Sequence, residues 1–227
     1  HKESNVSGAD WEWWWLQQGH FFGAAVQAKT LDSDHEYGID KTDRDDYPQI
    51  QKLIDYSLHY QVNALYCFYN YWNVLPQDLM DWPCRSFNNK PELWGCALAD
   101  IKSIWELHKQ GRYSLRDVLP CCMPWHCIAC CPGLLSGAQE GPATRACGIA
   151  SFLRRNRNPQ VDDEERLNRD QLVDLPEPDT ADELPDRIDQ LLDSVTDGDG
   201  ITRELVNDLW SEEPPNHVVL QGDVTEI

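Results

Sequence analysis

The first part of the chain alternates short apolar runs with segments of helical spacing. An unbroken apolar run covers residues 21–26 and continues directly into Gln27-Ala28-Lys29, which is typical of a buried strand. Apolar side chains at positions 50–58 then recur every three or four residues, as in an amphipathic helix. Residues 63–70 form a second segment typical of a buried strand, with apolar and aromatic side chains between Asn63 and Asn70. The pattern predicts a strand, a helix and a further buried strand in an α/β fold.

Further elements follow along the chain. Asp45 or Asp46 is expected to cap the first helix, which has Pro48 in its first turn. The pattern that begins at Pro91 predicts a helix to residue 108. Its apolar side chains lie on one face, which we expect to pack on the sheet. Three shorter segments complete the prediction: a helical turn at 115–119, an amphipathic helix at 184–195, and an edge strand or a frayed end at 217–220.

Charge and tryptophan content divide the 227 residues near position 150. Residues 1–150 hold 18 acidic and 12 basic side chains, and residues 151–227 hold 21 and 7, so the net charges are −6 and −14. Nine of the ten tryptophans precede residue 126. We therefore expect a folded α/β domain at 1–150, followed at 151–227 by an acidic, partly flexible extension with short helices.

Four side chains around the first apolar run have the chemistry of a cation site. Gln27 and Lys29 share one face of a strand and lie roughly 7 Å apart, because side chains alternate with period 2. Asp10 and Glu12 have the same spacing on the preceding segment. Two neighbouring strands would thus surround one point with carboxylate oxygens, an amide oxygen and an ammonium group. Mg²⁺ prefers such oxygen ligands together with a substrate phosphate.

Each residue type has a distinct role in that chemistry. Asp10 is the main metal ligand, and Gln27 is a weaker one because its amide does not ionise. Lys29 orients the attacking hydroxide or stabilises the transition state. Glu12 is either a further ligand or a partner of one. The alternative interpretation is a solvated ion pair on an exposed sheet face, although the surrounding tryptophans make unpaired charges there costly.

The order of these residues resembles the PD-(D/E)xK nuclease superfamily. Gly-x-Asp, then Gln-x-Lys 17 positions later (27 − 10) at the end of an apolar strand, is similar to its restriction-endonuclease-like Mrr branch, in which Gln replaces the usual acidic residue. The resemblance covers residues 3–70. It implies a restriction-endonuclease-like core, that is, a mixed central sheet flanked by helices, and it places Gln49 near the site. The superfamily usually has a helix before the Asp strand, so we expect an upstream segment that precedes His1.

The resemblance implies a Mg²⁺-dependent or Mn²⁺-dependent endonuclease, a hydrolase that cleaves DNA, with a role in bacterial defence against phage. RNA is not excluded as a substrate, and a homodimer is among the open oligomeric states. The alternative is a catalytically degenerate nuclease-fold module that binds nucleic acid or a protein partner. The position of Glu12 discriminates between an active nuclease and a binding module. Gln27 stands where the superfamily usually has a carboxylate, so catalysis requires that Glu12 supplies it.

A net charge of −20 argues against a surface that binds nucleic acid over its whole area. A nuclease needs only a local basic rim around its site. Lys41 and Arg44 are the substrate-binding candidates nearest the Gln-x-Lys segment. The basic run at 154–157 is a further candidate for a phosphate contact, and solvated surface is the alternative for each.

A second group of candidate ligands lies in the cysteine-rich segment 121–131. Cys122, His126, Cys127 and Cys130 could hold a structural Zn²⁺, because Cys127 and Cys130 have the C-x-x-C spacing. Buried structural thiols are the favoured alternative, and redox chemistry is a third. The chain contains no run of 18 apolar residues, which predicts that it does not span a membrane. The odd number of cysteines, nine, favours a reducing cytoplasm over a disulfide scaffold.

Overall fold

The computed structural model describes residues 7–17, 20–42, 46–71, 91–130, 142–155, 175–178, 183–196, 209 and 217–222. Its strands are β1 (Trp11–Gln17), β2 (His20–Thr30), β3 (Asn63–Tyr69), β4 (Cys96–Asp100), β5 (Cys122–Pro124) and β6 (His217–Gly222). Its helices are α1 (Gln49–Tyr60), α2 (Ile101–Lys109), α3 (Leu115–Val118), α4 (Cys127–Cys130), α5 (Pro142–Arg155) and α6 (Asp186–Thr196), with 3-10 turns η2 (Pro91–Trp94) and η3 (Leu119–Cys121). The protein is thus an α/β protein.

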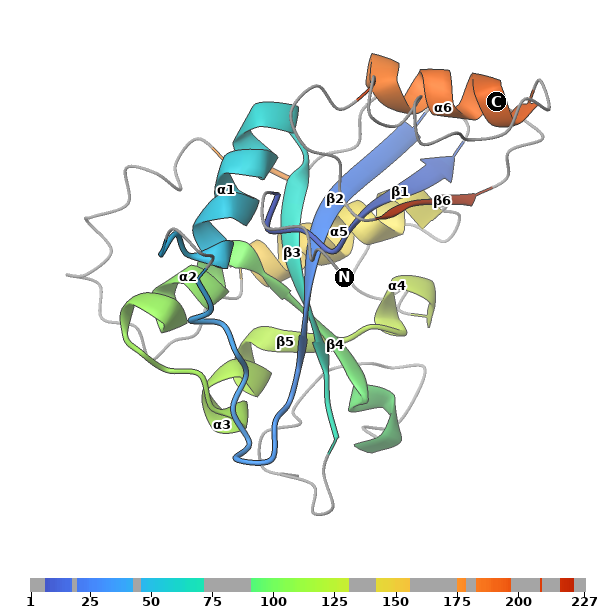
Figure 1. The fold of residues 1–227 in the computed structure, drawn as a ribbon. Coiled ribbons are helices and arrows are strands. Elements are labelled where there is room, and N and C mark those ends of the chain that lie inside the picture. The colour runs from blue at the N-terminus through green and yellow to red at the C-terminus, as the bar shows by residue number, and fades with distance from the viewer. Residues whose placement is uncertain are drawn as a thin grey trace.

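The described strands form one mixed sheet in the order β5-β4-β3-β2-β1-β6 (Figure 1). The pairs β1/β2, β3/β4 and β4/β5 are antiparallel, whereas β2/β3 and β1/β6 are parallel. Parallel neighbours need a crossover connection, and α1 provides it between β2 and β3. The strand, helix and strand predicted from residues 21–70 are therefore confirmed.

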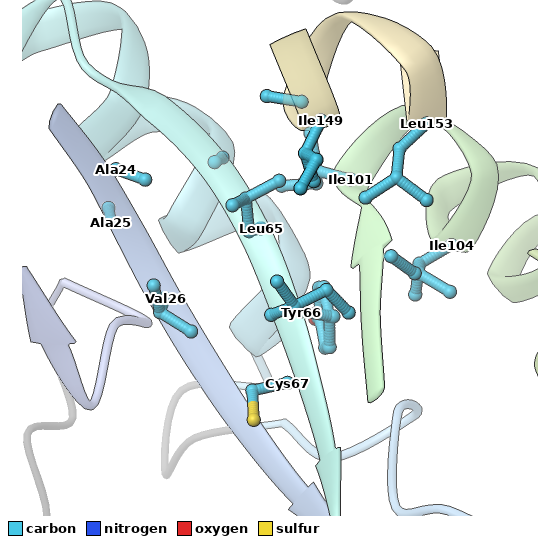
Figure 2. Close-up of a cluster of buried hydrophobic side chains, with 14 of the residues drawn as sticks. Ala24, Ala25, Val26, Leu65, Tyr66, Cys67, Ile101, Ile104, Ile149 and Leu153 are labelled. Atoms are coloured by element: carbon cyan, nitrogen blue, oxygen red, sulfur yellow. The ribbon is translucent and has the colours of Figure 1, made fainter. Parts of the chain in front are cut away.

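Helices cover both faces of this sheet. α1 and α2 contact β2, β3 and β4, while α5 contacts β1, β2 and β4. Figure 2 shows Leu65 and Tyr66 of β3 among side chains from helices, with Ile149 and Leu153 on α5 and Ile104 on α2. All of these side chains are buried. Consecutive residues of β3 point to opposite faces, which are both covered, and this explains why the strand is apolar from Ala64 onward instead of alternating.

The predicted helix at 91–108 is wrong in its first half. Residues 91–94 form the turn η2, residues 96–100 form the strand β4, and only then does α2 begin. The first four residues of β4 are small or apolar, and β3 and β5 pair with the strand on either side. Such a short apolar run has no period that separates a strand from a helix. Asp100 then caps α2 by accepting the backbone N–H of Lys102 at 2.9 Å.

The capping prediction for α1 also needs correction. Pro48 is the N-cap residue, with no capping hydrogen bond from a side chain. Asp46 has a φ of 58°, in the left-handed region that a short polar side chain tolerates. Asp45 lies outside the described residues. The first turn of α1 thus carries no acidic side chain.

The described parts of the chain beyond residue 150 pack on the same body as the parts before it. α5 runs through position 150 without a break, so the expected boundary there is not seen. β6 extends the sheet at β1, which resolves the open prediction for residues 217–220 in favour of an edge strand. α6 confirms the predicted amphipathic helix and buries Ile188, Leu191 and Leu192. No helix among the described residues is long and apolar enough to cross a membrane.

Candidate functional site

Asp10, Gln27, Lys29 and Gln49 come together where β1 begins, β2 nears its end and α1 starts. The register places Trp11 opposite Val26, so Asp10 lies beside Gln27. Gln49 is the first residue of α1. Gln27 and Lys29 are two positions apart on β2, so their side chains lie on the same face of the sheet. The contact of Lys29 with Gln49 shows that this is the face that α1 covers. Of the four residues predicted to surround one point, the structure thus brings Asp10, Gln27 and Lys29 to the start of α1, where Gln49 joins them, whereas Glu12 has other partners.

The carboxylate of Asp10 binds groups that the sheet leaves open. β1 begins opposite Val26, so the backbone N–H of Ala28 has no partner in the ladder with β1. Asp10 Oδ2 accepts that N–H at 2.6 Å and the side-chain amide of Gln27 at 2.5 Å. Asp10 is half-buried, and these two hydrogen bonds hold its carboxylate in place.

Gln27 currently presents its amide nitrogen to this carboxylate. The same nitrogen also donates to the carbonyl oxygen of Ala28 at 3.1 Å. A half-turn of the amide presents the oxygen instead, and a cation held by Asp10 would require that orientation. Gln27 is 5% exposed, so water has little access to its amide.

Lys29 is a buried cation with a fixed position. Its side chain is 6% exposed, and its Nζ donates to Oε1 of Gln49 at 2.6 Å. Burying an ammonium group costs free energy unless polar groups compensate for the lost water. The contact with Gln49 brings Lys29 to the N-terminal end of α1, where backbone N–H groups also favour anions.

Gly8 explains how Asp10 reaches this position. Its φ is +65°, and a Cβ there would lie 2.5 Å from the carbonyl oxygen of Gln49 and 2.6 Å from the backbone nitrogen of Leu53. Only glycine has both the conformation and the space. The chain before β1 therefore packs directly on the first turns of α1, which sets Asp10 beside that end of the helix.

Glu12 has a different environment from the one that an auxiliary metal ligand needs. Its carboxylate is fully buried and accepts hydrogen bonds from Nε1 of Trp14 at 2.6 Å and from the hydroxyl of Tyr56 at 2.5 Å. Arg187 of α6 forms an ion pair with the same carboxylate at 2.8 Å and stacks over Tyr60. These contacts favour a structural role for Glu12 over metal ligation.

Tyr66 is a neighbour that the sequence pattern did not indicate. It lies opposite Gln27 on β3, and its buried hydroxyl has no hydrogen-bond partner among the described residues. Burial raises the pKa of this phenol, and the charge of Asp10 raises it further. A tyrosine inside an apolar run carries no sequence signal of this kind, because only the strand register shows its neighbour.

The proposed basic rim is only partly described. Lys41 is exposed on the segment before α1, and its carbonyl oxygen accepts the backbone N–H of Gln49 at 3.0 Å. Arg44 lies outside the described residues. In the run at 154–157, Arg154 is not a surface residue: it is 5% exposed, and its Nε lies 3.1 Å from Oδ2 of the buried Asp100. Arg155 is exposed.

The candidate zinc ligands are only partly together. The Sγ of Cys122 donates to the carbonyl oxygen of Val118 at 3.2 Å, and burial raises the pKa of its thiol well above the usual range. Cys127 Sγ lies 3.6 Å from Nε2 of His126. The side chain of Cys130 lies outside the described residues. Within the parts of the chain that the structure describes, no group of three or more His, Cys, Asp or Glu side chains is placed to hold a metal ion. Zinc binding stays a prediction.

The comparisons with other proteins identify a family but no activity. The chain belongs to a family of unknown function, DUF6615, which matches residues 1–220. No curated protein and no solved structure matches the chain.

Proposed function

We propose that this protein is a metal-dependent nuclease with a restriction-endonuclease-like core, which hydrolyses phosphodiester bonds of DNA with Mg²⁺ or Mn²⁺. One observation carries the proposal: Asp10, Gln27 and Lys29 meet at the N-terminal end of α1, although 17 positions separate the first two. The two strands, the helix and the further strand that follow Asp10 agree with the family resemblance of residues 3–70.

The chain offers a defined set of roles for that reaction. Asp10 would hold the cation, with the amide oxygen of Gln27 as a second, neutral ligand. When bound, the metal lowers the pKa of a water molecule and neutralises charge on the phosphoryl group. Lys29, fixed by Gln49, places a positive charge where the transition state gains negative charge. The positive end of the α1 dipole, at Gln49, adds to the attraction for a phosphate.

Cleavage of DNA tests the proposal and is our first prediction. Supercoiled plasmid, single-stranded DNA and RNA are incubated with the protein in Mg²⁺, Mn²⁺ or EDTA. Lys29→Met keeps the volume of the buried side chain and removes its charge, and we expect it to lower the cleavage rate by about 100-fold or more. Lys109→Ala is the matched control, because Lys109 is exposed and pairs with Glu106 on α2. Equal cleavage by all three proteins would refute the proposed role of Lys29.

A second candidate function is supported by the contacts of Glu12. Since that carboxylate is bound to Arg187 and Tyr56, the site has one acidic side chain beside Gln27, as a degenerate nuclease fold would. In this case the protein binds nucleic acid or a partner protein without cleaving it. Wild-type protein that retards DNA in a gel but leaves it intact in both metals would favour this function over the first.

A further inference from the structure

Two cysteines on neighbouring strands lie in direct contact on the face opposite the candidate site. Sγ of Cys67 on β3 lies 3.4 Å from Sγ of Cys96 on β4, and both are reduced. Residues 65 and 100 are paired, and Asp100 binds Arg154 of α5, so both cysteines face the α5 side of the sheet. Neither residue belongs to the candidate site or to the cysteine-rich segment 121–131.

The two thiols differ in their surroundings. Cys67 is fully buried, whereas Cys96 is half-buried and is the first residue of β4. The hydrogen bond between the two sulfurs lowers the pKa of Cys96, while the same hydrogen bond and burial raise the pKa of Cys67. A small oxidant therefore meets the more reactive sulfur first, since the thiolate is the nucleophile.

We propose that Cys96 and Cys67 form a reversible oxidation site for a peroxide, with Cys96 as the reacting thiol and Cys67 as the resolving thiol. The sulfur of Cys96 attacks one oxygen of hydrogen peroxide, the O–O bond breaks, and a sulfenic acid and one water are formed. The sulfur of Cys67 then attacks the sulfur of Cys96, and the S–O bond breaks to release a second water. Two thiols lose two electrons and two protons, and one peroxide is reduced to two waters.

The position of Cys96 permits the approach that this bond requires. The register pairs Cys96 with Tyr69 and Leu98 with Cys67, so the cysteines are diagonal neighbours rather than directly opposite. A disulfide needs the two sulfurs at about 2.05 Å, so the strands must shift locally. Cys96 follows the exposed Gly95 at the very start of its strand, where the backbone hydrogen bonds from Asn70 to Gly95 and from Trp125 to Cys96 leave room for a small shift only. A disulfide formed under strain is easily reduced again, which makes the site reversible.

Mass spectrometry of the full chain tests the proposal. Reduced protein is treated with hydrogen peroxide, blocked with iodoacetamide under denaturing conditions and digested with trypsin. We expect wild type to lose two alkylated thiols, a change of about 2 Da before blocking, and to yield one peptide pair that joins Cys67 to Cys96. Dithiothreitol should reverse the link. Because the peptide with Cys67 also contains Cys84, the assignment is repeated in Cys84→Ser, which should keep the link.

Single variants separate the two roles. Cys67→Ser should stop at a sulfenic acid on Cys96, trapped by dimedone at about fivefold or more above the level in wild type. Cys96→Ser should give no dimedone adduct on Cys67, because that thiol is buried. Cys147→Ser is the matched control, a half-buried cysteine on α5 whose loss should leave the link unchanged. A link between other cysteines, no link in wild type, or an adduct on Cys67 in Cys96→Ser would overturn the proposal.

Discussion

Single residues in this protein carry structural and candidate catalytic roles at once. Asp10 satisfies the backbone N–H of Ala28, which β1 leaves open, and it is also the half-buried carboxylate of the candidate site. The spacing of Gln27 and Lys29 on one strand could be predicted from the sequence, because side chains alternate along a strand. The contact between Lys29 and Gln49 depends on where α1 starts, and the sequence prediction set that start too early, with Pro48 in the first turn instead of at the N-cap.

Glu12 was the residue whose role the sequence left open, and its contacts lead to our second prediction. Glu12→Gln removes the charge that faces Arg187, whose side chain is 11% exposed. We expect the free energy of unfolding to fall by about 3 kcal/mol, because one partner of a buried ion pair then lacks its counter-charge. Urea denaturation measures this loss. Binding of Mn²⁺ to the folded variant should be unchanged. A loss of Mn²⁺ binding would indicate that Glu12 is a metal ligand.

The buried pair of Asp100 and Arg154 gives a third prediction, which depends on pH. Arg154→Met should cost about 3–5 kcal/mol at neutral pH, because Asp100 is then buried without its cationic partner. Burial raises the pKa of Asp100 and Arg154 lowers it, so the variant raises that pKa further. An acid whose pKa is higher in the folded state than in the unfolded state loses stability as pH rises.

The deficit of Arg154→Met should therefore shrink as pH falls from about 8 to about 5, because protonation removes the unpaired charge of Asp100. Urea denaturation at the two pH values measures the change. Arg155→Met is the matched control, since Arg155 is the exposed neighbour and its Nε donates to the carbonyl oxygen of Ser151. If the loss of stability in Arg154→Met instead grew toward low pH, the predicted direction of the pH dependence would be wrong.

At the scale of elements, the sequence predicted the helices in which the helical spacing of apolar residues extends over several turns. It did not predict the strand whose apolar segment is short. α1 and α6 show apolar side chains at helical spacing over three turns, and both were predicted. β4 has only five residues, and the pattern merged it with α2 into one helix. Asp100 was the signal for the boundary, because an aspartate before an apolar periodic segment favours an N-cap.

β6 supplies a fourth prediction at this scale. A chain cut after residue 216 loses the parallel ladder with β1 and leaves Trp11 to Leu16 at an open edge. We expect Tm to fall by about 6 to 12 °C, the equivalent of roughly 3 kcal/mol for a chain of this size. A chain cut after residue 222 keeps the whole strand and is the control. If both cuts give the same Tm, β6 does not stabilise the sheet.

At the scale of the whole molecule, charge composition was a poor guide to organisation. The net charge of −14 in residues 151–227 predicted a separate acidic extension. Instead Arg154 and Arg187, two of the few cations in that part, are buried against Asp100 and Glu12 of the preceding part. Net charge counts exposed and buried groups alike, so it cannot show which cations bind the core. Those pairs appear only when segments 54 and 175 positions apart are brought together.

The central claim is that Asp10 anchors a divalent cation, and titration with Mn²⁺ followed by electron paramagnetic resonance tests it without knowledge of the substrate. We predict one Mn²⁺ site in wild type and an affinity at least about tenfold weaker in Asp10→Asn, which keeps the shape and removes the charge. Asp189→Asn on the exposed face of α6 is the control and should bind as wild type does. Equal Mn²⁺ affinity in wild type and Asp10→Asn, or no Mn²⁺ binding in wild type, would contradict the claim.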